Sequence, residues 1–513
     1  MREVALKVER RKQAIYVLKV SFPCANATCN DHSPALGKSY RTASTIDMLS
    51  DEVLLEIFGF IKSSRTPLEA RNNPVWEWHK LMHACQRWRQ IIFASQTRLD
   101  LQLLCTNGTP VRKSLGCWPT LPLVIAYSKD SQKRLSDDKD NIFAALEQRH
   151  RVRHINITAF NTLLKKLFAA MKEPFPALTH LELSAGIPIT PKFPRTFLGG
   201  STPHLRELSF TRMSFSTLRP LISSASNLVK LRLDAIPSKC FTRPKDLVTC
   251  LATLTRLDDF SMRFQRLTVR PPRLRLPFGT PLLLPTLSSF SFEGDSAYLA
   301  DFVSLINTPR LNSIDITYTG DFHYEVDEIP GFINRSAFMS SLFRHAEIYL
   351  DHGKTSFYVY PETKLDPPIA IHTVQTDTRP EAAYGQVIDM GEVLRPFKTI
   401  FSDVVHLEIK SDKPKEHQDN AIGSVDWPYL FHAFTAVQTL HVSWQFAKSI
   451  ADTKFEEYVD DSLSITRQAL PALISVFLEG QNAETIEKLS ATMRADNRSV
   501  VVVSDDSLQK VGN

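Results

Sequence analysis

The sequence repeats one short pattern, apolar-x-x-apolar-x-apolar, ten times. The first residues of the first seven sets are separated by 26, 27, 23, 29, 30 and 24 residues. The last three residues of each set alternate, which is the periodicity of a strand with one buried face. No unit of this length buries its apolar side alone, so the repeat predicts an array of stacked neighbours. The sets are Val152/Ile155/Ile157, Leu178/Leu181/Leu183, Leu205/Leu208/Phe210, Leu228/Leu231/Leu233, Leu257/Phe260/Met262, Leu287/Phe290/Phe292, Leu311/Ile314/Ile316, Val404/Leu407/Ile409, Val437/Leu440/Val442 and Leu473/Val476/Leu478.

Apolar stripes at helical spacing lie between several of these sets, at 160–171, 218–225, 247–254 and 299–306. One strand and one helix per period predict an α/β fold, with parallel strands on the inner side and helices outside. The pattern is weakest at about 320–400, which reads as inserted loop and strand around a degenerate set at Phe343, Ala346 and Ile348. The alternative is a generic α/β domain whose buried strands resemble one another.

A second feature precedes the repeats, at residues 46–92. Its first apolar stripe has the spacing of one helical face, and Ser50 is placed to cap that helix. Asp51 and Glu52 follow where a helix dipole favours negative charge. A second stripe predicts another helix. The two stripes are Leu49, Val53, Leu54, Ile57, Phe58 and Ile61, then Trp78, Leu81, Met82, Cys85, Trp88 and Ile92. Two helices of this kind need a cover for their apolar sides, either their own domain or another protein.

The string LSDEVLLEIFGFI resembles the opening of the F-box, Leu-Pro-x-Glu-hydrophobic-Leu-x-x-Ile-Phe, and HACQRWRQI resembles its later Val-Cys-x-x-Trp segment. Ser50 stands where that family usually has proline, and residues 62–77 make a long connection. The resemblance implies a small helical module that docks onto the Skp-type adaptor of a cullin ubiquitin ligase. The adaptor-binding residues that it implies are Leu49, Ser50, Val53, Leu54, Ile57, Phe58, Cys85 and Trp88.

The order of the two features is similar to that in fungal F-box proteins with divergent leucine-rich repeats. This resemblance extends over most of residues 43–480 and implies a substrate receptor with a helical module and an irregular leucine-rich-repeat solenoid. We therefore predict an α/β chain with this organisation: a poorly ordered extension at 1–42, an F-box-like domain at 43–98, a connector or cap at 99–150, a solenoid at 151–480, and a C-terminal helix, strand and tail at 481–513.

The predicted strands each place one side chain between their last two apolar residues. Because that side chain faces away from the core, it is available to a partner. The residues at these positions mix polar, charged and aromatic types without a dominant sign, which favours protein recognition over a phosphate backbone or an anionic membrane. The candidate substrate-binding residues are Glu182, Arg232, Asp315, Glu408 and His441.

The sequence favours a protein without its own chemistry. No G-x-S-x-G or G-x-G-x-x-G motif occurs. A metal site at Cys24, Cys29 and His32 would lack a fourth ligand, so we expect no metal. From the absence of these motifs we also expect no catalytic residue and no cofactor. A ligase receptor needs none, because partner enzymes supply the reaction.

The bulk properties limit the location and the partners. A net charge of +6 over 513 residues is modest, so we expect no nucleic-acid partner. No run of about 18 apolar residues occurs, so we expect no membrane partner. Seven scattered cysteines form no disulfide framework and favour the cytoplasm or the nucleus. Two alternatives remain: a repeat scaffold without a ligase role, whose first helices only cap the array, and a mitochondrial or nucleic-acid-associated protein with a basic N-terminus.

Overall fold

The structure is a computed structural model that divides into two compact units, Met1–Ile157 (unit 1) and Thr158–Asn513 (unit 2). The finer division given above stays a prediction, and the expected extension at 1–42 and Trp78 lie outside the described residues. The described residues are 46, 48–62, 81–107, 109–128, 137–186, 193–237, 243–265, 280–319, 328–336, 343–351, 354–361, 369–374, 382–411, 427–452, 458–460, 465–467, 469–479, 483–495 and 499–505.

Unit 1 begins with the two helical elements that the apolar stripes predict. Helix α2 (Asp51–Lys62) carries two acidic residues in its first turn. The backbone N–H of Val53 donates to Ser50 Oγ at 3.4 Å, which confirms Ser50 as the cap. Before helix α4 (Gln86–Ala94), the described residues 81–82 are also helical.

The prediction of one continuous second helix is wrong at Cys85. This residue has an extended backbone, with φ −157° and ψ 168°, and its Sγ accepts a hydrogen bond from the backbone N–H of Trp88 at 3.5 Å. Cys85 therefore interrupts the helical pattern and caps helix α4. The apolar spacing continues across this break, which is why periodicity alone does not find it.

The rest of unit 1 alternates strands and helices. Its elements are β1 (Leu103–Thr106), α5 (Val111–Cys117), β2 (Leu123–Ser128), α6 (Asp137–Glu147) and β3 (Val152–Ala159), and the boundary between the units falls within β3. Strands β1 and β2 pair in parallel, with Leu103 opposite Leu123. Residues 137–141 belong to helix α6, so the region that the sequence assigns to the connector contains regular structure.

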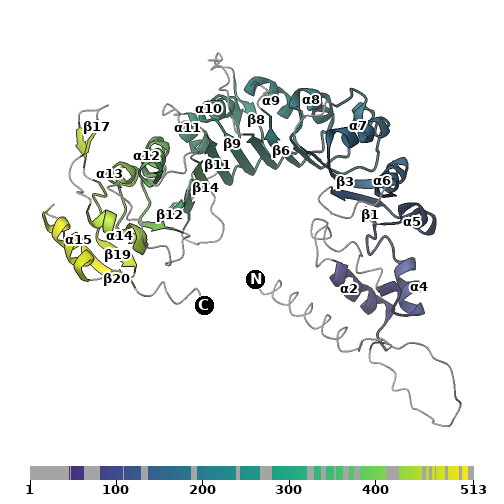
Figure 1. The fold of residues 1–513 in the computed structure, drawn as a ribbon, viewed down its shortest axis with the longest axis horizontal. Helices are drawn as coiled ribbons and strands as arrows, with labels where there is room; N and C mark the ends of the chain where they lie inside the picture. The colour runs from purple at the N-terminus through teal and green to yellow at the C-terminus, as the bar shows by residue number, and fades with distance from the viewer. Residues whose placement is uncertain are drawn as a thin grey trace, which may run out of the picture. The chain divides into compact units, whose positions relative to one another are not determined.

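Unit 2 is a mixed α/β assembly built on a large, mostly parallel sheet (Figure 1). Its strand order is β4-β5-β6-β7-β9-β11-β14-β13-β12-β15-β16-β19-β20. The elements are α7 (Asn161–Ala170), β4 (His180–Ala185), η2 (Phe197–Gly200), β5 (Glu207–Thr211), α8 (Phe215–Ser224), β6 (Lys230–Ile236), α9 (Pro244–Leu251), β7 (Asp259–Phe264), β8 (Leu282–Leu283), β9 (Ser289–Gly294), α10 (Ser296–Ser304), β10 (Ile306–Asn307), β11 (Ser313–Thr319), α11 (Glu328–Asn334), β12 (His345–Asp351), β13 (Lys354–Tyr360), β14 (Ile369–Val374), α12 (Ala382–Leu394), η5 (Arg395–Phe397), β15 (His406–Lys410), α13 (Trp427–Phe431), β16 (Thr439–Val442), α14 (Trp444–Ala451), β17 (Tyr458–Asp460), β18 (Ile465–Arg467), β19 (Ser475–Glu479), α15 (Ala483–Ala495) and β20 (Val501–Asp505).

The predicted strands and helices agree closely with these elements. Each of the ten apolar sets contributes its last three residues to a strand, and all the apolar residues of the sets are buried. The apolar stripes between the sets correspond to α7, α8, α9 and α10. Phe160 is an exception, because it precedes α7 as its N-cap and stays 41% exposed. The α/β class is thus confirmed.

The region of weak pattern contains a reversal of chain direction. Strands β12 and β13 form an antiparallel pair, with residues 352 and 353 between them. Strand β14 then pairs antiparallel with β13 and parallel with β11. The set at Phe343, Ala346 and Ile348 is buried, and its last two residues lie in β12, which pairs in parallel with β15. The spatial order of these three strands is therefore the reverse of their order in the chain.

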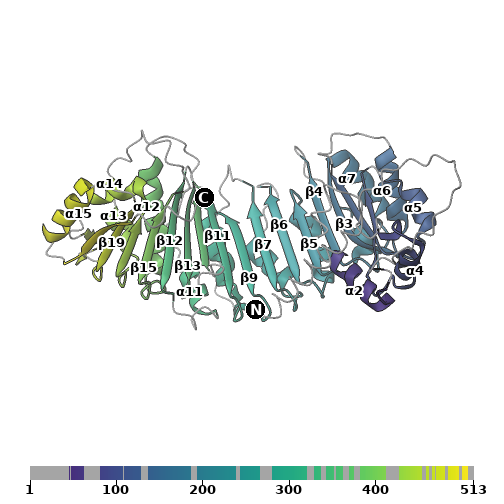
Figure 2. The same cartoon turned by 90° about the horizontal axis from the view of Figure 1, so that it is seen from below.

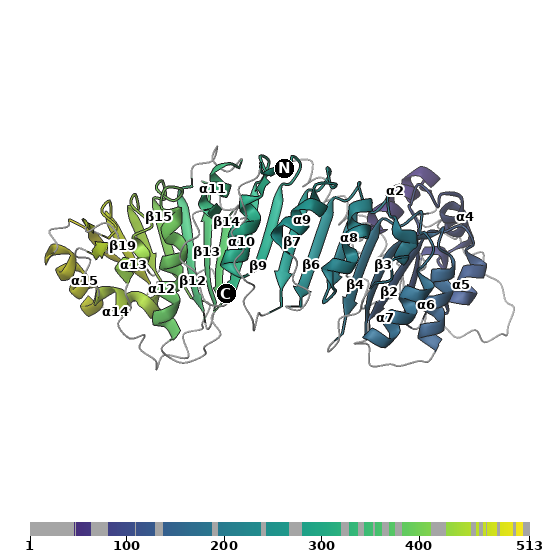
Figure 3. The same ribbon diagram turned by 90° about the horizontal axis from the view of Figure 1, so that it is seen from above.

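Helices cover one face of the sheet in unit 2 (Figure 3). The core between the two layers is aromatic: Phe302 of α10 lies 5.8 Å from Phe260 of β7 and 5.9 Å from Phe290 of β9, ring centre to ring centre. The described helices of unit 2 leave the opposite face uncovered (Figure 2). We call this uncovered surface the open face. None of the described helices combines the length and apolar character that crossing a lipid bilayer requires.

Candidate functional site

The open face presents one residue from each strand in a continuous row. The pairing registers join these residues in a series, from β4 at one end to β20 at the other. Neighbouring strands lie about 4.8 Å apart, so neighbours in the row can contact one partner together. The row, named the central row below, consists of Glu182, Ser209, Arg232, Ser261, Ser291, Asp315, Ala370, Tyr358, Glu347, Glu408, His441, Phe477 and Val503.

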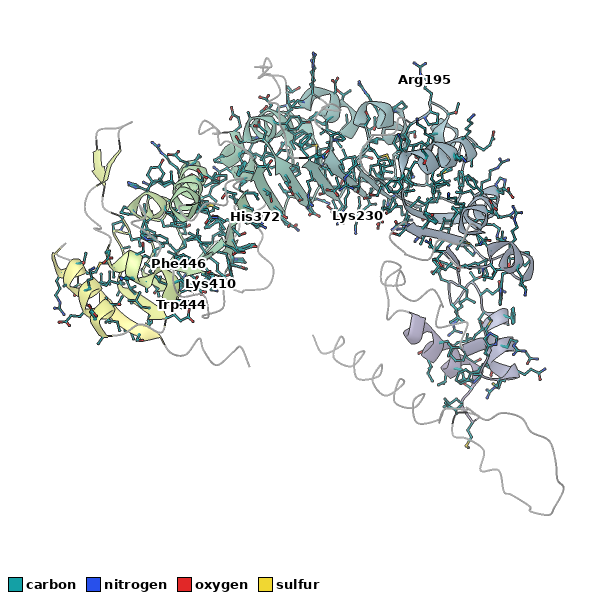
Figure 4. All side chains as sticks on the ribbon, in the orientation of Figure 1. Arg195, Lys230, His372, Lys410, Trp444 and Phe446 are labelled. Atoms are coloured by element: carbon teal, nitrogen blue, oxygen red, sulfur yellow. The ribbon has the colours of Figure 1, made fainter. Side chains whose placement is uncertain are left out.

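All five candidate substrate-binding residues predicted from the sequence belong to the central row. Glu182, Arg232 and Asp315 lie on β4, β6 and β11, and Glu408 and His441 lie on β15 and β16. Lys230 and His372 lie on this same side of the sheet, whereas Arg195 projects on the side of the helices (Figure 4). The structure therefore brings the five residues onto one surface, and their role in binding stays a prediction.

Sequence reasoning missed the residues that the antiparallel strands add to this surface. Glu347 lies between Ala346 and Ile348, so the rule that identified Glu408 would have identified it too. Tyr358 has no such signal. Lys354 stands where a set would begin with an apolar residue, because β13 enters from a tight antiparallel connection rather than from a helix.

Glu347 is the centre of a polar network on β12, β13 and β15. Its side chain is only 6% exposed, and its carboxylate accepts from Lys410 Nζ at 2.8 Å. The hydroxyls of Tyr360 and Tyr349 donate to the other carboxylate oxygen at 3.1 and 3.3 Å. Lys410 also pairs with Glu408. A carboxylate buried to this degree needs such partners, since an unpaired charge in the interior is strongly unfavourable.

The electrostatics of the network keep Lys410 charged. Burial alone would lower the pKa of Lys410, but its hydrogen bonds to Glu347 and Glu408 outweigh burial and raise it. Burial raises the pKa of Tyr360, and the charge of Glu347 raises it further. Burial likewise raises the pKa of Tyr349. At neutral pH the ammonium group is therefore cationic and both phenols are protonated.

The same cluster offers possible metal ligands. His345 Nε2 lies 3.2 Å from Glu408 Oε1 and 3.4 Å from Glu347 Oε1. The donor atoms of these three residues lie within 4.8 Å of one another. Lys410 already contacts both carboxylates, so a metal ion would have to displace an ammonium group that neutralises them. The arrangement fits an ion-pair network better than a metal centre.

Aromatic rings extend the network along the open face. Tyr358 makes edge contacts with Tyr349 at 5.6 Å and with His372 at 5.4 Å. His372 Nε2 lies 3.4 Å from Asp315 Oδ1, and its buried Nδ1 has no hydrogen-bond partner among the residues that the structure describes. Farther along, the rings of His441 and Phe477 stack at 4.6 Å. Rings held in this way lose little conformational entropy when a partner covers them.

The second candidate surface lies in unit 1, on α2 and α4. Leu54 and Phe58 of α2 are buried, and Phe58 makes an edge contact with Trp88 of α4 at 5.0 Å. Arg87 joins the two elements, since its guanidinium lies 2.7 Å from Asp51 Oδ1 and 2.6 Å from the carbonyl oxygen of Leu49. The two helices therefore bury part of their apolar surface against each other.

Several apolar residues in the described part of α2 and just before it stay accessible. Met48 is 78% exposed and Val53 44% exposed, while Leu49 and Ile57 are half-buried. The residues that the resemblance assigns to adaptor binding thus divide into three groups by burial. Leu54, Phe58 and Trp88 are buried, Leu49 and Ile57 are half-buried, and Ser50, Val53 and Cys85 are exposed.

A search with models of protein families finds no match to the chain, and a search of the curated proteins finds no match either.

Proposed function

We propose that this chain is the substrate-recognition subunit of a Skp–cullin–F-box ubiquitin ligase. In this proposal α2 and α4 form an F-box-like module that binds the Skp-type adaptor. The strands and helices of unit 2 form an irregular leucine-rich-repeat solenoid whose open face receives the target protein. The chain itself needs no catalytic group, because it acts by raising the concentration of the target near the transferred ubiquitin.

The observation that carries the proposal is the bare apolar surface beside the α2–α4 contact. The helices already pack against each other through the buried residues Leu54, Phe58 and Trp88. Met48 and Val53 stay exposed although this packing is in place. Met48 and Val53 lie five residues apart in the sequence at the start of the same segment, and exposed apolar surface that is contiguous marks a protein interaction site. The F-box-like sequence of the same segment supports an adaptor as the partner.

Two features of unit 2 support target binding. Its successive parallel strands present a wide row of side chains, and the described helices leave this row uncovered.

The cysteines support a reducing compartment such as the cytoplasm or the nucleus, where the ligase would act. The free thiols are Cys85, Cys105, Cys117 and Cys250.

The test is co-purification of the full chain with the Skp-type adaptor. Met48→Glu together with Val53→Glu should abolish binding, because both side chains are exposed and two charges would have to be desolvated at the interface. Leu283→Glu, at a side chain 54% exposed in unit 2, is the matched control and should leave binding unchanged. Thermal melting should be the same for all variants, since exposed positions contribute little to folding.

Two outcomes would overturn the proposal. Wild-type protein that does not bind the adaptor would favour the alternative, a repeat scaffold whose first helices only cap the array. Equal binding by the wild type and the double variant would show that Met48 and Val53 are not part of the docking surface.

A further inference from the structure

The charged side chains of strands β4, β5, β6, β7, β9 and β11 all lie on the open face. They are six carboxylates and three basic groups, so this part of the face has a net charge of −3. The whole chain has a net charge of +6. The acidic character therefore belongs to this surface and not to the molecule as a whole. The carboxylates are Glu182, Glu207, Asp234, Asp259, Glu293 and Asp315, and the basic residues are Lys230, Arg232 and Arg263.

The three basic side chains are already engaged with carboxylates of the same surface. Arg263 Nε lies 2.7 Å from Glu293 Oε2, and Arg232 Nη2 lies 3.6 Å from Asp259 Oδ2. Lys230 Nζ lies 4.0 Å from Glu207 Oε1. The basic groups therefore cannot attract an acidic partner strongly, and the surplus of carboxylates sets the sign of the field above these strands.

We infer that the open face over β4–β11 binds an extended, basic segment of the target protein. This inference rests on the proposal that the sheet of unit 2 receives the target. Charge complementarity selects this occupant, because a phosphate backbone or an anionic lipid surface would be repelled by the surplus carboxylates. Glu182 and Asp315 mark the two ends of the site, on β4 and β11.

The dimensions of the face set the length of the segment. Five strand-to-strand steps separate Glu182 from Asp315, and each step is about 4.8 Å, so the carboxylates span about 24 Å. An extended chain rises about 3.3 Å per residue, which corresponds to about seven residues. A basic side chain at every second residue of such a segment would face the sheet.

The test uses the full chain and two fluorescein-labelled octapeptides. One peptide alternates arginine with leucine, and the other has glutamate in place of arginine. Fluorescence anisotropy should show binding of the arginine peptide alone, and the affinity should fall as sodium chloride is raised because salt screens exposed charges. Glu182→Gln with Asp315→Asn should weaken binding about tenfold, or about 1.4 kcal/mol in total, because two exposed charge pairs each contribute a modest amount.

The matched control changes the same charge on the covered side of the sheet. Asp246 lies on α9 and Asp301 on α10, so Asp246→Asn with Asp301→Asn removes two negative charges away from the open face. This variant should bind the arginine peptide as the wild type does. Equal weakening by both double variants, or equal binding of both peptides, would overturn the inference. Concentration-dependent dimerisation that the Glu182/Asp315 variant abolishes would instead identify a second copy of the chain as the occupant and would also overturn it.

Adaptor binding measured on the same samples separates this inference from the proposed function. The Glu182/Asp315 variant should keep adaptor binding, because its substitutions lie in unit 2. If the chain discriminates between the peptides but does not bind the adaptor, the binding of a basic segment by the open face is supported and the ligase role is refuted. If it binds the adaptor but does not discriminate between the peptides, only the binding of a basic segment is refuted.

Discussion

Lys410 should be the most important charged residue for the stability of the sheet around the antiparallel strands. Lys410→Met removes the ammonium group that contacts both Glu347 and Glu408. Breaking a buried ion pair by removing one partner costs about 3–5 kcal/mol. The Lys410 side chain is 28% exposed, so water can replace part of its interaction and we expect a cost of about 3 kcal/mol, the lower end of that range.

The loss of stability caused by substituting Glu347 should depend on whether Lys410 is present. Glu347→Gln removes a charged acceptor and should cost about 2 kcal/mol, because a hydrogen bond to a charged group contributes about 1.5–3 kcal/mol. The double variant loses both partners of one interaction, so its cost should stay near about 3 kcal/mol. The difference from the sum of the single costs is a coupling free energy of about 2 kcal/mol.

The assay is hydrogen exchange read by mass spectrometry on peptides from β12, β13 and β15. It measures the free energy of local opening, which matters because long arrays need not unfold in one cooperative step. Lys354→Met is the control: this lysine lies on β13, is exposed, and should contribute less than about 0.5 kcal/mol.

The dependence on pH follows from the sign of the shift. The folded-state pKa of Lys410 lies above its ordinary value of 10.5, so the stability from its charge is fully present below pH 10.5 and is lost only at higher pH. The contribution of the Lys410 charge should therefore be constant between pH 7 and 9. Additive costs of the single variants, or a Lys410→Met protein as stable as the wild type, would refute the reasoning.

Three further predictions concern other parts of the chain. Trp88→Ala should destabilise the α2–α4 pair by about 3–5 kcal/mol, because the indole is buried against Phe58; exchange in residues 81–94 checks this, and unchanged protection would contradict it. Alkylation at pH 8, mapped by peptide mass spectrometry, should modify the exposed Cys85 and Cys117 but spare Cys105. Burial raises the pKa of Cys105 to about 12, so rapid labelling of it in the folded protein would be inconsistent with that burial. Burial lowers the pKa of His180 below its ordinary 6.5, so its contribution to stability is present above pH 6.5 and is lost as pH falls through that value toward the folded-state pKa. The melting temperature of His180→Gln should accordingly fall less between pH 7.5 and 5.5 than that of the wild type, and an equal fall would rule out this role.

The sequence alone determined the strands and helices of the regular part of the fold. Sets such as Leu205/Leu208/Phe210 encode both the strand and its buried face, because alternation along a strand leaves one choice of inward side. The same alternation identified Glu182 and Glu408 as outward residues. Ser50 was identified as a helix cap because a side-chain oxygen at that position can reach a free backbone N–H.

Only the tertiary structure decided which outward residues become neighbours. The antiparallel strands insert Tyr358 and Glu347 between Asp315 and Glu408 in the central row. Tyr358 precedes Glu347 in the row although it follows Glu347 in the sequence. The acidic character of the open face appears only when Glu207, Asp234, Asp259 and Glu293 are placed beside the central row. Likewise, the contact between Phe58 and Trp88 separates buried from exposed residues on a helix whose stripe looks uniform in sequence. Local periodicity specifies the direction of a side chain, whereas pairing between distant segments specifies its surroundings.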